Sequence, residues 1–171
     1  MTVAVETGLW QLDPARTSVS LRHKTMWGLV TVKGVFATVA GEGEVQADGT
    51  ARGTVTLDVA SLDTKNGKRD KHLRSADLFD AERHPTITFA VDNAVVAQDD
   101  TVEVTGRLTV RGITKPQPVV ARVTAASAED VTLAAEFTVD RDQFDMGWNQ
   151  MGMLRGLATV VSTLVFTRVK G

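Results

Sequence analysis

Apolar and polar side chains alternate along most of the chain. In residues 101–111, every second position from Val102 to Val110 is apolar except Gly106, and the positions between them are Thr, Glu or Arg. The same period of two recurs in three further segments, residues 55–59, 87–91 and 131–139. Such alternation indicates antiparallel strands that bury one face. Gly106 stands in the apolar series, where a sharp bend or a close approach of another segment would require a glycine.

Five more runs have the composition of strands. Val and Thr together make up more than a quarter of the chain, and β-branched residues favour the strand over the helix. The runs cover residues 8–13, 17–24, 28–39, 117–125 and 157–169. Turn signals such as "DPAR", "ADGT" and "SAED" separate the strands, and no linker or repeat is visible. The pattern predicts an all-β fold, a closed or nearly closed antiparallel β-barrel of about eight strands, in a single domain over residues 1–171.

One segment departs from this pattern. Half of the residues in "GKRDKHLRSADLFD" are charged, and the segment predicts a short helix near residues 65–76 with Thr64 or Asn66 as its N-cap. The charges fit a solvated helix surface, and Leu73 and Phe79 would anchor the segment to the barrel. We therefore interpret it as structural. A weaker alternative is that its Lys and Arg side chains attract an anionic ligand head at the barrel mouth.

The long strands predict a deep barrel. Eleven residues at about 3.3 Å each, tilted by roughly 40°, give a wall of about 28 Å, and the interior of an eight-stranded barrel holds side chains or one slender ligand. An elongated apolar molecule would suit that space. The alternation places nine apolar side chains on the lumen as ligand contacts: Val19, Leu21, Phe36, Leu57, Ile87, Phe89, Leu108, Phe137 and Phe166.

Three further residues are candidates for ligand contact. His23 shares the inward face of Val19 and Leu21, so it is either a core histidine bonded to the backbone or a polar contact for a ligand head or carbonyl group. Phe144 and Trp148 belong to the apolar, glycine-containing run "FDMGWNQMGML". That run either plugs one end of the barrel or forms a mobile apolar mouth through which a lipid enters.

Charge and composition exclude several functions. The formal net charge of -2 gives no general attraction for nucleic acid, and the absence of cysteine excludes disulfides and thiolate chemistry. His72 and His84 are not spaced as metal ligands, and Ser75, His72 and Asp70 are too close in sequence to form a catalytic triad. We therefore expect no catalytic residue, metal or cofactor. Because no leader and no run of about 20 apolar residues is visible, we expect a cytoplasmic protein without a membrane span.

Three motifs carry a resemblance to a known family. The run "SLDTKNGKRDKHLRSADLFDAERHPTITF" (residues 61–89) resembles the signature of the YceI-like polyisoprenoid-binding proteins. "GRLTVRGITKPQPV" (residues 106–119) is similar to a hairpin of that family, and "DRDQFDMGWN" (residues 140–149) to one of its turns. The match spans nearly the whole chain. The resemblance implies a lipocalin-like, extended antiparallel β-barrel that holds a long isoprenoid or similar amphiphile in its lumen.

The residues and the resemblance together predict non-enzymatic binding of a long apolar amphiphile, in storage or transport. The expected ligand is a polyisoprenoid, an isoprenoid quinone or a fatty acyl derivative. Two alternatives stay open. The barrel would be the dry reaction chamber of an enzyme if a second inward polar group with a perturbed pKa lay near His23. It would be a protein-interaction module if it had no continuous lumen. A homodimer is also left open.

Overall fold

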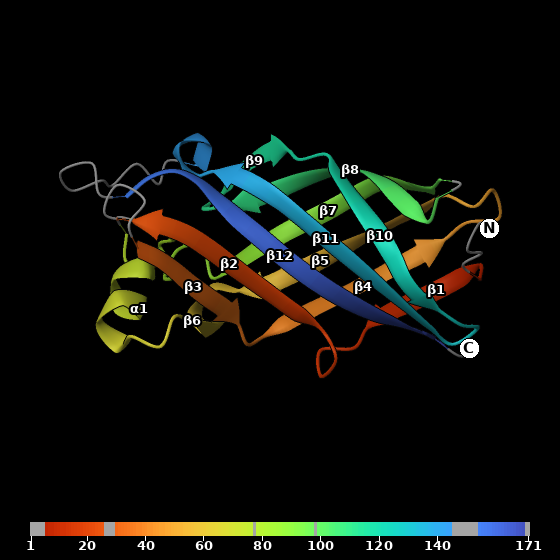
Figure 1. Cartoon of the computed structure of the whole chain (residues 1–171), viewed down its shortest axis with the longest axis horizontal. Coiled ribbons are helices and arrows are strands. Elements are labelled where there is room, and N and C mark those ends of the chain that lie inside the picture. The colour runs from red at the N-terminus through yellow and green to blue at the C-terminus, as the bar shows by residue number, and fades with distance from the viewer. Residues whose placement is uncertain (1–5, 26–29, 77, 98, 145–153, 170–171) are drawn as a thin grey trace.

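A computed structural model describes residues 6–25, 30–76, 78–97, 99–144 and 154–169. The strands wrap into an elongated antiparallel β-barrel, with the short helix α1 (Gly67–Leu73) at one end and both chain termini toward the other (Figure 1). The predicted all-β, lipocalin-like barrel is therefore confirmed.

The described residues form twelve strands in one sheet. They are β1 (Gly8–Leu12), β2 (Ser18–Thr25), β3 (Val30–Phe36), β4 (Val39–Val45), β5 (Ala51–Asp58), β6 (Leu62–Asp63), β7 (Thr86–Val96), β8 (Thr101–Val110), β9 (Ile113–Pro116), β10 (Val119–Ala126), β11 (Asp130–Asp140) and β12 (Leu154–Arg168). Two 3-10 helices, η2 (Val59–Ser61) and η3 (Arg141–Phe144), follow β5 and β11.

Some of these strands lie end to end and occupy a single position in the ring. β12 pairs with β2 through residues 154–163 and with β1 through residues 166–168, so β1 and β2 together form one side of the barrel. Three further pairs of strands also lie end to end and share one position each: β3 with β4, β5 with β6, and β9 with β10. The result is a ring of eight positions in chain order, which the pairing of β1 with β12 closes.

The prediction of one strand over residues 28–39 is wrong in its bounds. β3 ends at Phe36 and β4 begins at Val39. Both of these side chains are buried, although an uninterrupted strand would place residues three apart on opposite faces. At the bend, the backbone N–H of Ala37 donates to the carbonyl of Ser61 at 3.2 Å. The bend breaks the period of two, and beyond it the chain pairs with different neighbours.

Inward side chains gather into two apolar clusters. The larger one includes residues of the α1 region and buries Leu12, Val19, Phe36, Val39, Val59, Leu62, Leu78, Phe79, Ile87, Leu108, Val110 and Phe144. The other buries Trp10, Val102, Ala121, Val123 and Val131. Gly106 confirms the predicted close approach, because a Cβ at this position would lie 2.6 Å from Cζ of Phe89.

Helix α1 is shorter than the predicted range of residues 65–76. Asn66 is its N-cap, and the Asn66 side chain accepts a hydrogen bond from the backbone N–H of Arg69 at 3.1 Å. The chain turns back after the helix, where the N–H of Phe79 donates to the carbonyl of Leu73 at 3.0 Å. Phe79 is buried in the larger cluster and Leu73 packs against it, as expected for the anchors of this segment.

The expectation that the charges of α1 are solvated is wrong for Asp70. This side chain is only 9% exposed, and its Oδ1 atom accepts hydrogen bonds from the backbone N–H, at 3.0 Å, and the hydroxyl of Thr64. Arg69 donates to the same residue, from Nε to the Thr64 hydroxyl and from Nη2 to the Thr64 carbonyl, both at 2.8 Å. This network ties α1 to the loop that precedes it.

Candidate ligand-binding cavity

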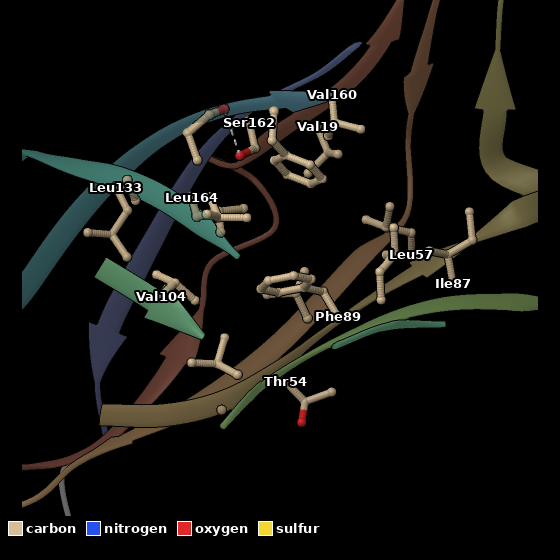
Figure 2. A pocket seen from close by; sticks show the side chains of 18 of the residues that line it. Val19, Thr54, Leu57, Ile87, Phe89, Val104, Leu133, Val160, Ser162 and Leu164 are labelled. Atoms are coloured by element: carbon tan, nitrogen blue, oxygen red, sulfur yellow. Dashed lines mark hydrogen bonds between the residues drawn. The ribbon is translucent and has the colours of Figure 1, made fainter. Parts of the chain in front are cut away.

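The interior of the barrel contains a cavity of about 390 Å³. Inward side chains from strands all around the ring form its wall, and Figure 2 shows Leu57, Phe89, Val104, Leu133 and Leu164 around one shared space. Small-molecule sites in proteins typically have volumes of roughly 300 to 1,000 Å³. The cavity is therefore large enough to hold a ligand.

The structure places eleven of the twelve predicted contact residues on this wall. They are Val19, Leu21, His23, Phe36, Leu57, Ile87, Phe89, Leu108, Phe137, Phe144 and Phe166. The twelfth, Trp148, lies outside the described residues. These eleven residues line the cavity, and their contact with a ligand stays a prediction.

Several wall residues are only half-buried although they point inward. Leu57, Phe89, Phe137 and Phe166 all keep some exposed surface, and all of them line the cavity. The rings of Phe89 and Phe137 are tilted by 32° with centroids 6.2 Å apart. A close-packed core would bury these side chains completely. Their exposed parts therefore offer an apolar surface to a ligand.

Polar side chains are sparse on the inward faces of the described strands. Ser162 is buried, and its hydroxyl donates to the carbonyl of Ala135 at 3.2 Å, so the wall itself satisfies this group (Figure 2). His23 lies in the inward row with Val19 and Leu21 and is half-buried. Both interpretations of His23, as a core residue and as a ligand contact, remain compatible with this position.

The α1 end of the cavity combines an apolar cap with two basic side chains. Leu73, Leu78 and Phe79 from the α1 segment line the cavity beside Phe144 of η3. Arg69 and His72, both from α1, line it as well. Sequence reasoning placed both residues on a solvated helix, with the weaker alternative that its Lys and Arg side chains, Arg69 included, attract an anionic ligand head. No local pattern distinguishes them, since their place depends on how α1 docks onto the barrel.

Trp10 lines the opposite part of the cavity and is only 3% exposed. Its Nε1 group donates to the carbonyl of Glu6 at 3.0 Å, so the indole has a partner for its polar atom. Sequence reasoning missed Trp10 as a site residue. The alternation within residues 8–13 contained the signal, because Trp10 and Leu12 occupy the same face of the strand.

The described residues do not form the triad or the metal site that the sequence brought into question. Ser75 donates from its hydroxyl to the backbone carbonyl of His72 at 2.5 Å, while Asp70 accepts from Thr64, so these side chains do not form a triad. Over the part of the chain that the structure describes, no three His, Cys, Asp or Glu residues come together to hold a metal ion. None of the described helices is long and apolar enough to cross a membrane.

Comparison with known sequences assigns residues 10–166 to the YceI-like domain. A UPF0312 protein of Vibrio vulnificus is 34% identical to this chain over 129 residues, which cover 74% of the chain and 60% of the relative. A UPF0312 protein of Ectopseudomonas mendocina is 42% identical over 69 residues, which cover 40% of the chain and 36% of the relative. The chain therefore spans less than two thirds of either curated relative.

Two solved structures share the fold. BcnA of Burkholderia cenocepacia matches with a TM-score of 0.81 and 24% identity, over 90% of this chain and 98% of that chain. A polyisoprenoid-binding domain from Saccharophagus degradans, described as implicated in plant cell wall breakdown, matches with a TM-score of 0.77 and 15% identity. That match covers 96% of this chain and 100% of the other. At these identities the likeness establishes the fold alone.

Proposed function

Because this chain belongs to the YceI-like domain family, we propose that it binds a long apolar amphiphile in its barrel, in storage or transport, without converting it chemically. Family membership and the apolar wall together support lipid binding in general. The observation that carries the proposal is the cavity of about 390 Å³, which is lined by members of both apolar clusters.

The proposed ligand is a polyisoprenoid, an isoprenoid quinone or a fatty acyl derivative. All three have a slender apolar chain that suits a lumen between strands of up to 15 residues. Affinity would come from buried apolar area, at about 25 cal/mol for each Å² removed from water. The Saccharophagus degradans domain of the same fold is described as polyisoprenoid-binding, which favours an isoprenoid among the three.

The cavity wall also bears on the two alternative functions, a protein-interaction module and an enzyme. A protein-interaction module with a packed barrel has no lumen, whereas this barrel contains one. An enzyme needs polar groups that converge on a reacting atom. On the inward faces of the described strands, the cavity has His23 and Ser162, and the Ser162 hydroxyl donates to a backbone carbonyl. We therefore favour binding over catalysis.

A matched pair of variants tests this proposal. Ala135 lines the cavity, whereas its neighbour Ala134 belongs to the opposite face of β11 and does not. Ala135→Phe should fill the lumen and abolish binding of an added isoprenoid quinone or fatty acid, while Ala134→Phe should bind like the wild type. Native mass spectrometry, with extraction of lipid that co-purifies, measures occupancy and identifies the ligand.

Thermal unfolding accompanies the binding measurement. We expect Ala135→Phe to melt within a few degrees of the wild type, since the added ring occupies space that is already open. Undiminished binding in a folded Ala135→Phe variant would contradict a ligand site in the lumen. Failure of the wild type to bind any of the three lipid classes would contradict the proposal as a whole.

A further inference from the structure

Arg69 is a cation at the edge of an apolar cavity. It is half-buried, lines the cavity, and is fixed by bonds from Nε and Nη2 to the hydroxyl and carbonyl of Thr64. Both partners are neutral oxygen atoms. The neighbouring carboxylate, Asp70, accepts from Thr64 instead, and no ion pair to Arg69 is found within the described ranges. Among the described residues no carboxylate bonds the guanidinium directly, and Asp70 is linked to it through the Thr64 hydroxyl.

Helix α1 carries more cations than carboxylates. Helix α1 carries Lys68, Arg69 and Lys71 against the single carboxylate of Asp70, and Arg74 follows at its C-cap. Burial of a charge beside apolar groups costs free energy unless an opposite charge or hydrogen bonds compensate it. Two hydrogen bonds to Thr64 and partial exposure compensate the Arg69 charge in part, and an anion in the cavity would add a direct opposite charge.

Charged side chains near the other end of the cavity face outward. Glu42, Glu44 and Arg52 are exposed and alternate along β4 and β5 with the inward positions Gly43 and Gly53. Water screens such charges, so they add little to the electrostatic potential inside the lumen. The half-buried Arg69 at the α1 end is therefore the side chain of the cavity lining best placed to hold an anion.

We propose that the bound amphiphile has an anionic head, a carboxylate or a phosphate, which Arg69 of α1 binds while the apolar tail extends toward Trp10 of β1. Helix α1 and strand β1 lie toward opposite ends of the barrel (Figure 1). The planar guanidinium matches the geometry of both anions. Its bonds to Thr64 use Nε and Nη2, and the Nη1 group remains to donate to the head. This inference rests on the proposed lipid-binding function and adds the class of head group and the direction of the ligand.

Head-group selection is tested with amphiphiles that share one tail. Palmitate, hexadecyl phosphate and hexadecanol differ only in the head, and each is titrated into the wild type, Arg69→Met and Lys68→Met. Lys68 is an exposed cation on the same helix and is not part of the cavity lining, so it is the matched control. Arg69→Met should weaken binding of both anions by roughly tenfold or more, since a charge-assisted hydrogen bond is lost. Hexadecanol should bind Arg69→Met and the wild type equally.

Three other outcomes would contradict the inference. Equal weakening of the anions and hexadecanol in Arg69→Met would assign Arg69 a purely structural role and overturn the inference. The inference would also fail if Lys68→Met weakened the anions as much as Arg69→Met does. Inorganic phosphate alone should bind at least a hundredfold more weakly than hexadecyl phosphate, because the tail supplies most of the affinity. Equal affinity would indicate a free-anion site instead of a head-group site.

The direction of the ligand is tested without altering Arg69. The chain has three tryptophans, so the double variant Trp27→Phe, Trp148→Phe leaves Trp10 as the sole indole. Palmitate with bromine at the tail end should quench Trp10 emission more strongly than palmitate with bromine beside the carboxylate. The reverse order would place the head near Trp10 and contradict the inference. Absence of binding by palmitate, hexadecanol and isoprenoid quinone alike would instead contradict the proposed function.

Discussion

Gly106 provides the space that the Phe89 ring occupies. The two residues belong to neighbouring strands, and a Cβ on Gly106 would lie 2.6 Å from Cζ of Phe89 and 2.9 Å from the carbonyl oxygen of Ala90. Neither distance is compatible with the van der Waals radii of the atoms, so an added methyl group would displace the ring, the strand or both. Because the Phe89 ring lines the cavity, this single position affects the shape of the lumen as well as the stability of the wall.

We predict that Gly106→Ala lowers the free energy of unfolding by roughly 1 to 3 kcal/mol, the usual cost of overpacking. Urea unfolding measures the difference. Gly67→Ala is the control, because a Cβ there meets no atom within 4 Å, and its stability should match or slightly exceed that of the wild type. Adding Phe89→Leu to Gly106→Ala should recover part of the loss. Strict additivity of the two changes would show that the Phe89 ring is not the obstacle.

The loop before α1 depends on a buried network at the scale of the element. Thr64 and Asp70 are both buried, and Asp70 accepts two hydrogen bonds from Thr64. Because α1 has only seven residues, its backbone bonds alone give little stability. The network and the apolar anchors Leu73 and Phe79 therefore hold the helix at the end of the barrel, which also fixes the position of Arg69.

Removal of the Asp70 carboxylate should loosen this element. We predict that Asp70→Ala costs roughly 1 to 3 kcal/mol, because it leaves two buried donors of Thr64 without their acceptor. Asp70→Asn retains an acceptor oxygen and should cost less. Chemical unfolding gives the free energies, and hydrogen exchange at the amides of α1 reports whether the helix itself has loosened. A loss in Asp70→Ala no larger than that in Asp70→Asn would contradict the role assigned to the acceptor.

At the scale of the whole molecule, carboxylates close turns around the barrel. The pKa of Asp13 is lowered mainly by the side-chain bond from Arg16, and the pKa values of Asp48 and Asp99 mainly by the hydroxyls of Thr50 and Thr101. The pKa of Asp63 is lowered mainly by the backbone N–H of Lys65. In all four cases the carboxylate accepts from the N–H two residues later, which stabilises its charged form.

These shifts predict acid sensitivity of the fold. The folded-state pKa values lie below the ordinary value of 3.8, so the stabilisation is complete above that pH and is lost as the pH falls through the folded-state values. Thermal unfolding at a series of pH values should therefore show a decrease in melting temperature on the acid side, limited by solvent screening of these surface carboxylates. In the variant with Asn at positions 13, 48, 63 and 99 the decrease should be shallower. An equally steep decrease would show that other carboxylates control the response.

The sequence by itself determined most of the strands and, within them, the side that faces the lumen. A period of two fixes which side chains share a face, and this local property placed Val19, Leu57, Phe89 and Phe137 on the cavity wall. The local signals at Asn66 and Gly106 were less specific, because the sequence left Thr64 as an alternative N-cap and a sharp bend as an alternative reason for the glycine. The motifs for the YceI-like family also reside in contiguous sequence.

Only the tertiary structure decided which elements meet and whether the lumen stays open. The closing pair of β1 and β12 joins residues that lie far apart along the chain, and periodicity contains no information about partners. Burial of Asp70, the bend between β3 and β4, and the placement of Arg69 and Trp10 at opposite ends of the cavity all follow from that assembly. The alternation of apolar residues specifies which face of a strand points inward. The space left between those faces depends on how the eight strand positions close into a ring.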